Sequence, residues 1–133
     1  MIIDTHTHLN IDEFEMDLEE VLERAKLNLV DKMFVIGMNE KTNKRALELA
    51  YCYKQLYPTV GIHPSYVDEN DDLEVLENMI KDSNVVAIGE IGLDYYYETT
   101  NKLQQKECLL KFFDLAKKYN LPVLIHCRDA LQD

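Results

Sequence analysis

The sequence predicts an α/β fold built on parallel strands. Short apolar runs rich in β-branched residues alternate with longer amphipathic segments along the whole chain, in the order strand, helix, strand. The apolar runs also lack the polar and apolar alternation of half-exposed strands, which is typical of parallel strands covered on both faces. We therefore expect five strands joined by four helices, with right-handed crossovers.

Five apolar runs bounded by Gly, Pro or Asn predict the strands. They are MIID (1–4), KMFVIG (32–37), PTVGI (58–62), VVAIGEIG (85–92) and PVLIH (122–126). Four strand–helix units separate the first run from the fifth, so one unit takes roughly 30 residues and a closed eight-stranded barrel needs roughly 250. The 133 residues therefore predict either a smaller open sheet or the front part of a larger barrel.

Four segments between these runs place apolar residues at helical spacing. They are DLEEVLERAKLN (17–28), TNKRALELAYCYK (42–54), DDLEVLENMIK (71–81) and QQKECLLKFFDLAKKYN (104–120). In the first segment the stripe runs from Leu18 to Leu29, and Thr42 is the predicted N-cap of the second helix. Two lysines near residue 118 suit the C-terminus of the fourth.

Composition limits the classes of function. The formal net charge is -11, so the chain lacks the basic surface of a non-specific nucleic-acid binder, and a phosphate-bearing substrate would need metal ions or a few placed cations. We see neither an apolar run long enough to cross a bilayer nor a secretory signal. Three cysteines, an odd number without C-x-x-C spacing, predict a reducing, cytoplasmic setting.

All four histidines and one glutamate fall at or near predicted strand ends: His6, His8, His63, Glu90 and His126. The carboxyl ends of parallel strands meet at one rim, where ligands bind. Side chains at positions i and i+2 of a strand share a face, so the first two imidazoles can point at one metal ion. Glu90 could bridge to a second ion held by His126, giving two ions about 4 Å apart for hydrolysis of phosphodiesters.

Structural explanations of the same residues stay open. An H-x-H pair is often incidental, and His63 could simply be held extended by the proline that follows it. Glu90 could be a buried carboxylate paired with a cation, and His126 could pack in the core.

Four motifs, in this order and spacing, resemble a known family: DTHTHLN (4–10), VGIHP (60–64), IGEIGLDYYY (88–97) and LPVLIHCRDA (121–130). The chain resembles the TatD-type metal-dependent deoxyribonucleases of the amidohydrolase-like TIM-barrel superfamily. The resemblance implies that His6 and His8 bind one divalent ion (Zn, Mn or Mg), that Glu90 bridges two ions, and that His126 binds the other. It places His63 on the substrate side, as a catalytic residue with Glu90, and implies DNA as substrate, commonly single strands or 3′ ends.

The chain departs from the family pattern beyond its fifth strand. The family's later His ligand and the Asp of a T-D-x-P-like motif are absent from residues 1–133, and the family's usual length is near twice this one. Residues 1–133 thus resemble an incomplete TIM-barrel domain: five strands and four helices, without the last three strands. We expect weak or no activity from this chain alone, and self-association or pairing with a complementary C-terminal half that covers the fifth strand's exposed edge.

Further residues near the rim are candidates for contacting substrate. Tyr95 begins a run of three tyrosines that could stack unpaired bases or simply pack on helices. Arg128 could bind phosphate, or pair with Asp94 or Asp129, and Asp129 could hydrogen-bond a metal ligand. Two other functions stay open: an amidohydrolase-like enzyme acting on another ester or amide, and a non-catalytic half-barrel that serves association.

Overall fold

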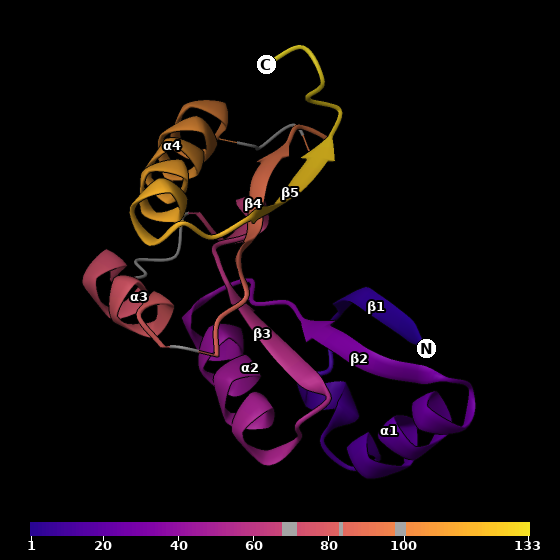
Figure 1. Cartoon of the computed structure of the whole chain (residues 1–133). Coiled ribbons are helices and arrows are strands. Elements are labelled where there is room, and N and C mark those ends of the chain that lie inside the picture. The colour runs from indigo at the N-terminus through magenta and orange to yellow at the C-terminus, as the bar shows by residue number, and fades with distance from the viewer. Residues whose placement is uncertain (68–71, 83, 98–100) are drawn as a thin grey trace.

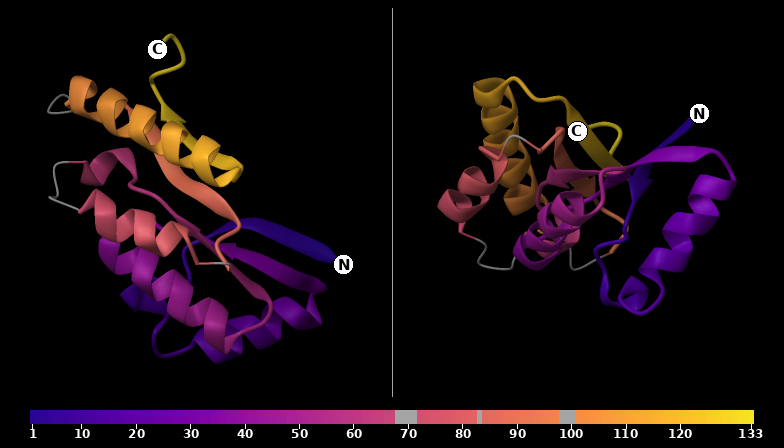
Figure 2. Two further views of the ribbon diagram at one scale, coloured as in Figure 1. Left: turned by 60° about the vertical axis from the view of Figure 1, so that its left-hand side comes forward. Right: turned by 60° about the horizontal axis from the view of Figure 1, so that its bottom comes forward.

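The strands and helices follow the predicted order. The computed structural model describes residues 1–67, 72–82, 84–97 and 101–133. Five parallel strands, in the spatial order β1-β2-β3-β4-β5, form one curved open sheet, and the helices lie along one side of it (Figures 1 and 2). The strands are β1 Ile2–Thr7, β2 Val30–Val35, β3 Leu56–Val60, β4 Ala87–Asp94 and β5 Val123–Arg128. The helices are α1 Leu18–Leu27, α2 Glu40–Cys52, α3 Leu73–Ile80 and α4 Lys102–Tyr119, with short 3-10 turns at Asp12–Phe14 and Pro64–Tyr66. The α/β half-barrel of five strands and four helices is confirmed.

Two expectations about helix ends are wrong. The N-cap of α2 is Asn39 rather than Thr42: the Asn39 side chain accepts a hydrogen bond from the Thr42 amide, and the Thr42 hydroxyl accepts one from the Asn39 amide. This reciprocal capping box moves the start of the helix to Glu40. Leu29 is exposed and has a positive φ of 64°, because α1 already ends at Leu27.

The apolar core lies in two clusters between the sheet and the helices. One cluster lies under β2 and β3 against α1 and α2, with Leu22, Val35 and Leu49 among its buried members. The other lies between β3, β4 and the helices α3 and α4, and it includes Ile88 and Phe112. Burial of apolar surface on this side fixes the sheet to the helices and so fixes the rim.

The inner and outer strands differ in burial. All eight residues of β4 are buried, as expected for a strand covered on both faces. The two end strands are not covered in this way: Ile2 of β1 is 53% exposed and Ile125 of β5 is 56% exposed. β1 pairs only with β2 and β5 only with β4 among the described residues, so each presents a free edge. No described helix combines the length and the apolar character needed to span a membrane.

Candidate metal centre

The predicted site residues lie in or just after four strands and converge at the carboxyl-terminal side of the sheet. His6 lies in β1 and His8 just beyond it, Glu90 lies within β4, and His126 lies in β5. His63 does not end β3 as expected but follows it by three residues, where it caps the 3-10 turn that starts at Pro64. Its position is nevertheless fixed, since the His63 amide donates a hydrogen bond of 2.8 Å to the Met38 carbonyl.

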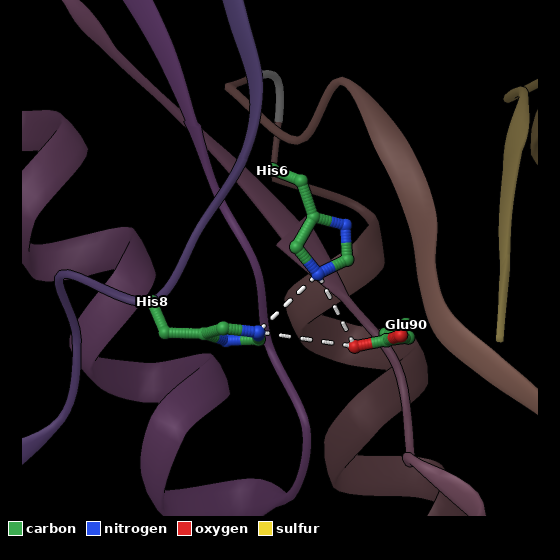
Figure 3. Close-up of side chains that lie close together, drawn as sticks. All are labelled: His6, His8 and Glu90. Atoms are coloured by element: carbon green, nitrogen blue, oxygen red, sulfur yellow. Dashed lines mark hydrogen bonds and ion pairs between the residues drawn. The ribbon is translucent and has the colours of Figure 1, made fainter.

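The first group joins the H-x-H pair to the glutamate. Nε2 of His6 lies 3.2 Å from Nε2 of His8 and 3.5 Å from Oε2 of Glu90, and Nε2 of His8 lies 4.0 Å from the same oxygen. Figure 3 shows the two imidazoles and the carboxylate pointing toward one another from separate segments of the chain. These three donors could hold one metal ion.

The second group uses the other oxygen of the same glutamate. Nδ1 of His126 lies 3.1 Å from Oε1 of Glu90 and 3.1 Å from Nε2 of His63. These three atoms lie close enough together to surround one ion, and the hydrogen bonds of His63 decide whether its Nε2 can be a ligand. Glu90 is 8% exposed. Each of its two carboxylate oxygens faces a different pair of histidines. This is the arrangement that a bridging carboxylate requires.

A buried aspartate contacts the other ring nitrogen of His126. Nε2 of His126 lies 3.0 Å from Oδ2 of Asp94. Burial alone would raise the pKa of the Asp94 carboxyl, but hydrogen bonds from the Tyr96 amide and from His126 lower it below its ordinary value. A carboxylate oxygen accepts a hydrogen bond from an imidazole N–H, so the contact with Asp94 favours the proton on Nε2, and a metal ion beside Oε1 of Glu90 would then meet the lone pair of Nδ1.

His63 is held in the opposite orientation. The Ser65 amide donates a hydrogen bond of 3.1 Å to Nδ1 of His63. Burial lowers the pKa of His63, and the neighbouring His126 lowers it further, although Glu90 and Asp94 act to raise it. In the neutral ring the proton therefore lies on Nε2, which donates to Nδ1 of His126. Since Nδ1 of His63 already accepts a hydrogen bond, its Nε2 presents an N–H group, and not a lone pair, to Glu90 and His126.

The donor set fits divalent ions. Burial and the neighbouring His6 lower the pKa of His8, against the attraction of Glu90, which favours the neutral ring that a metal needs. Two imidazole nitrogens 3.2 Å apart repel each other unless a proton or a cation lies between them. Imidazole nitrogens with carboxylate oxygens suit Zn²⁺ and Mn²⁺.

Buried amides hold the backbone around these ligands. The side-chain nitrogen of Asn10 donates to the carbonyls of Ile36 and Thr42, at 2.8 and 2.9 Å. Asn43 brackets Gly61, donating to its carbonyl at 2.9 Å and accepting from its amide at 3.1 Å. Sequence reasoning missed these residues, although the position of Asn10 two residues after His8, inside a motif, was an available signal.

A glycine allows β4 to approach His126 closely. Gly92 pairs with His126 across the sheet and has a φ of 150°. A Cβ atom there would lie 1.9 Å from the His126 carbonyl oxygen, so no other residue fits without displacing β5.

The predicted substrate residues lie beside the second group. The Arg128 guanidinium carbon lies 3.5 Å from the ring centroid of Tyr96 and 5.8 Å from that of Tyr97, and all three side chains are exposed. In the part of the chain that the structure describes, Arg128 forms no salt bridge with either neighbouring aspartate. Tyr95 is half-buried, with the Lys102 nitrogen 4.2 Å above its ring.

An open parallel half-barrel whose rim gathers histidines around one shared carboxylate is typical of metal-dependent hydrolases of the TIM-barrel kind. A family model confirms the class and gives the family: the model described as TatD related DNase matches residues 3–133, so the chain belongs to that family.

Three relatives illustrate the similarity. The chain is 43% identical to "Uncharacterized metal-dependent hydrolase YabD" of Bacillus subtilis (strain 168), covering 100% of this chain and 53% of that protein. It is 33% identical to "3'-5' ssDNA/RNA exonuclease TatD" of Pectobacterium atrosepticum, covering 97% of this chain and 51% of the relative. The crystal structure of the TatD homologue YjjV from Escherichia coli matches with a TM-score of 0.90 and 36% identity, over 96% of this chain and 51% of that one. The chain thus spans about half the length of the relatives it matches.

Proposed function

We propose that this chain provides the metal-binding rim of a hydrolase that cleaves phosphodiester bonds in DNA, acting on single strands or 3′ ends. The observation that supports the proposal is the division of one carboxylate, Glu90, between two pairs of histidines. The name of the Pectobacterium relative, a 3'-5' ssDNA/RNA exonuclease, supports the choice of substrate. Cytoplasmic localisation stays a prediction from the cysteine count.

The chain's own residues divide the task. His6 and His8 would hold one ion with Oε2 of Glu90, and His126 would hold a second with Oε1. Divalent ions bound there would supply Lewis acidity, which activates water and polarises a phosphoryl oxygen. The Glu90 carboxylate would lie between the two ions and offset part of their positive charge.

His63 has a different role from its neighbour. Because Ser65 holds its Nδ1 as an acceptor, the neutral ring offers an Nε2–H group at the same rim. We infer that this N–H group donates to a phosphoryl or leaving-group oxygen of the substrate. This agrees with a substrate-side role for His63 rather than that of a third ligand to the second ion.

The surface beside the second group suits a nucleic-acid strand. Arg128 brings a cation to the rim of a chain whose net charge is -11, and it lies against the exposed ring of Tyr96. Guanidinium and aromatic planes stack unpaired bases, and guanidinium also binds phosphate. Tyr95, half-buried below Lys102, stays a prediction as a substrate contact.

The two free sheet edges suggest a partner. Relatives about twice as long place further chain beyond the matched part. We propose that β1 and β5 are covered by a complementary C-terminal half or by a second copy, and that hydrolysis by the chain alone is weak. Sedimentation velocity tests this: a monomer of 15.6 kDa that binds no apolar dye would contradict it.

The test of function compares substrates and metals in one design. The chain is incubated with Zn²⁺, Mn²⁺ or Mg²⁺ and with end-labelled single-stranded DNA, a simple ester or an amide, with Glu90→Gln as the matched control. Shortening of the DNA from its 3′ end, lost in the control, is the expected result. Cleavage of the ester or amide alone would favour another amidohydrolase-like activity, which the acidic net charge supports. If calorimetry detects no metal binding, the half-barrel serves association only.

A further inference from the structure

Both oxygens of the Asp94 carboxylate are engaged, each with a different part of the site. Oδ2 lies 3.0 Å from Nε2 of His126, and Oδ1 accepts a hydrogen bond of 3.0 Å from the Tyr96 amide. Asp94 ends β4, pairs with Arg128 across the sheet, and is 4% exposed. A single buried carboxylate thus connects the imidazole of the second group to the loop that carries Tyr96.

A buried glutamine fixes the backbone of this aspartate. Oε1 of Gln105, on α4, accepts a hydrogen bond of 2.8 Å from the Asp94 amide, and its Nε2 donates to the Asp94 carbonyl at 3.1 Å. The same Nε2 lies 3.4 Å from the carbonyl of Pro64, the residue after His63. Gln105 is 3% exposed, so these bonds are shielded from water. Asp94 therefore has little freedom to turn away from His126.

We propose that Asp94 is a positioning residue that selects the tautomer of His126 and so determines the nitrogen that meets the metal. With the proton held on Nε2 by Asp94, Nδ1 keeps its lone pair for a metal ion beside Glu90, whose Oε1, 3.1 Å from Nδ1, would otherwise compete for the same ring proton. A carboxylate behind a histidine ligand orients the ring and raises its basicity. Asp129, which the sequence suggested for this part, follows β5 in a positive-φ conformation, whereas Asp94 makes the contact. The proposal deepens the proposed metal centre and rests on it for the identity of the ligand.

The variant Asp94→Asn tests the assignment while keeping the shape of the side chain. Its amide oxygen still accepts from Tyr96, but its NH₂ group donates toward Nε2 of His126, which moves the ring proton to Nδ1 and closes that nitrogen to a metal. In the full chain we expect the affinity for the second ion to fall about 10- to 100-fold, with the first site unchanged, measured by titration calorimetry with Mn²⁺. The control Asp129→Asn removes the same charge three residues after His126 and should leave both affinities unchanged.

Long-range proton–nitrogen NMR of the metal-free wild type provides a readout that depends neither on metal nor on the folding of a variant. The wild-type spectrum should show His126 protonated on Nε2, and Asp94→Asn should show it protonated on Nδ1. Wild-type His126 protonated on Nδ1 would overturn the proposal, as would equal metal affinities of Asp94→Asn and the control. If the wild type binds no metal, the proposed function fails, while the tautomer of His126 still decides the role of Asp94.

Discussion

The two pairs of histidines that share Glu90 differ in how they are held. The His6 side chain is 47% exposed, and its ring contacts only His8 and Glu90 among the interactions found in the described residues. His126 is 22% exposed, and buried Asp94 fixes its ring from behind. Glu90 therefore lies between two differently supported pairs. Protein contacts orient the ring of His126, whereas the ring of His6 would be oriented mainly by a bound ion. The contrast indicates that preorganisation is concentrated on the side of the site where the proposed substrate residues lie.

Removing the shared carboxylate should have the largest effect, because both pairs of histidines then lose the same partner. We expect Glu90→Gln to weaken metal binding at both positions by more than about 100-fold, since each group loses its only anionic donor. Titration calorimetry with Mn²⁺ measures this, and Glu107→Gln, an exposed position on α4, is the matched control. Loss at one position only would show that Glu90 does not bridge.

Removing the buried amide should weaken only the preorganised side. We expect Gln105→Leu to lower the free energy of unfolding by about 2–3 kcal/mol, since two backbone groups of Asp94 lose their partners in a buried setting. The affinity of the His126 pair for Mn²⁺ should fall as well, and that of the His6 pair should not. Urea unfolding and calorimetry check both effects, with Gln132→Leu at an exposed position as control. An equal loss at both pairs would contradict the assignment.

Alanine substitutions of the two histidines should separate the pairs by stability. His126→Ala leaves Oδ2 of buried Asp94 without its donor and should cost about 1–2 kcal/mol in the metal-free protein. His6→Ala removes an exposed ring and should change stability by less than about 0.5 kcal/mol. Denaturant unfolding in the presence of a chelator makes the measurement. An equal loss in the free energy of unfolding for both variants would show that His126 is held no more firmly than His6.

The smallest effect concerns the contact between α3 and α4, away from both pairs. Lys118 and Tyr119 each donate to the Glu77 carboxylate, and these bonds lower its pKa below the ordinary value of 4.5. A lowered pKa in the folded state means that the stabilisation is complete above pH 4.5 and is lost as pH falls through the lowered value.

Glu77→Gln should therefore reduce stability at pH 7 and bring the variant toward the wild type as the solution becomes more acidic than pH 4.5. Unfolding curves between neutral and acidic pH test this, and Glu74→Gln on the same helix is the control. Metal affinity should not change. A stability gap that stays constant with pH would show that the ionised carboxylate is not what stabilises the contact.

The sequence was sufficient for the strand order and for bringing the five ligand-type residues to one rim, because apolar runs and strand ends are local features. It did not reveal that Asp94 and Gln105 form one unit, because their side chains meet only when α4 packs on β4. The exposed edge of the fifth strand was predicted, and Ile125 is exposed there, but the exposure of Ile2 was not predicted, since an apolar run looks the same on an inner and an outer strand. The start of α2 was misjudged because Thr42 and Asn39 are both good caps, and only the reciprocal bonds decide between them.

The free edges of β1 and β5 have a geometric consequence. Any parallel strand that adds beside either edge continues the same ladder of hydrogen bonds, and its carboxyl end is then delivered to the rim where Glu90 lies. An added strand with a histidine or an aspartate at that end would bring a further ligand-type side chain to the proposed metal centre without any change in the residues already present. The two free edges thus specify both where a partner strand can attach and where the side chains at its carboxyl end will lie.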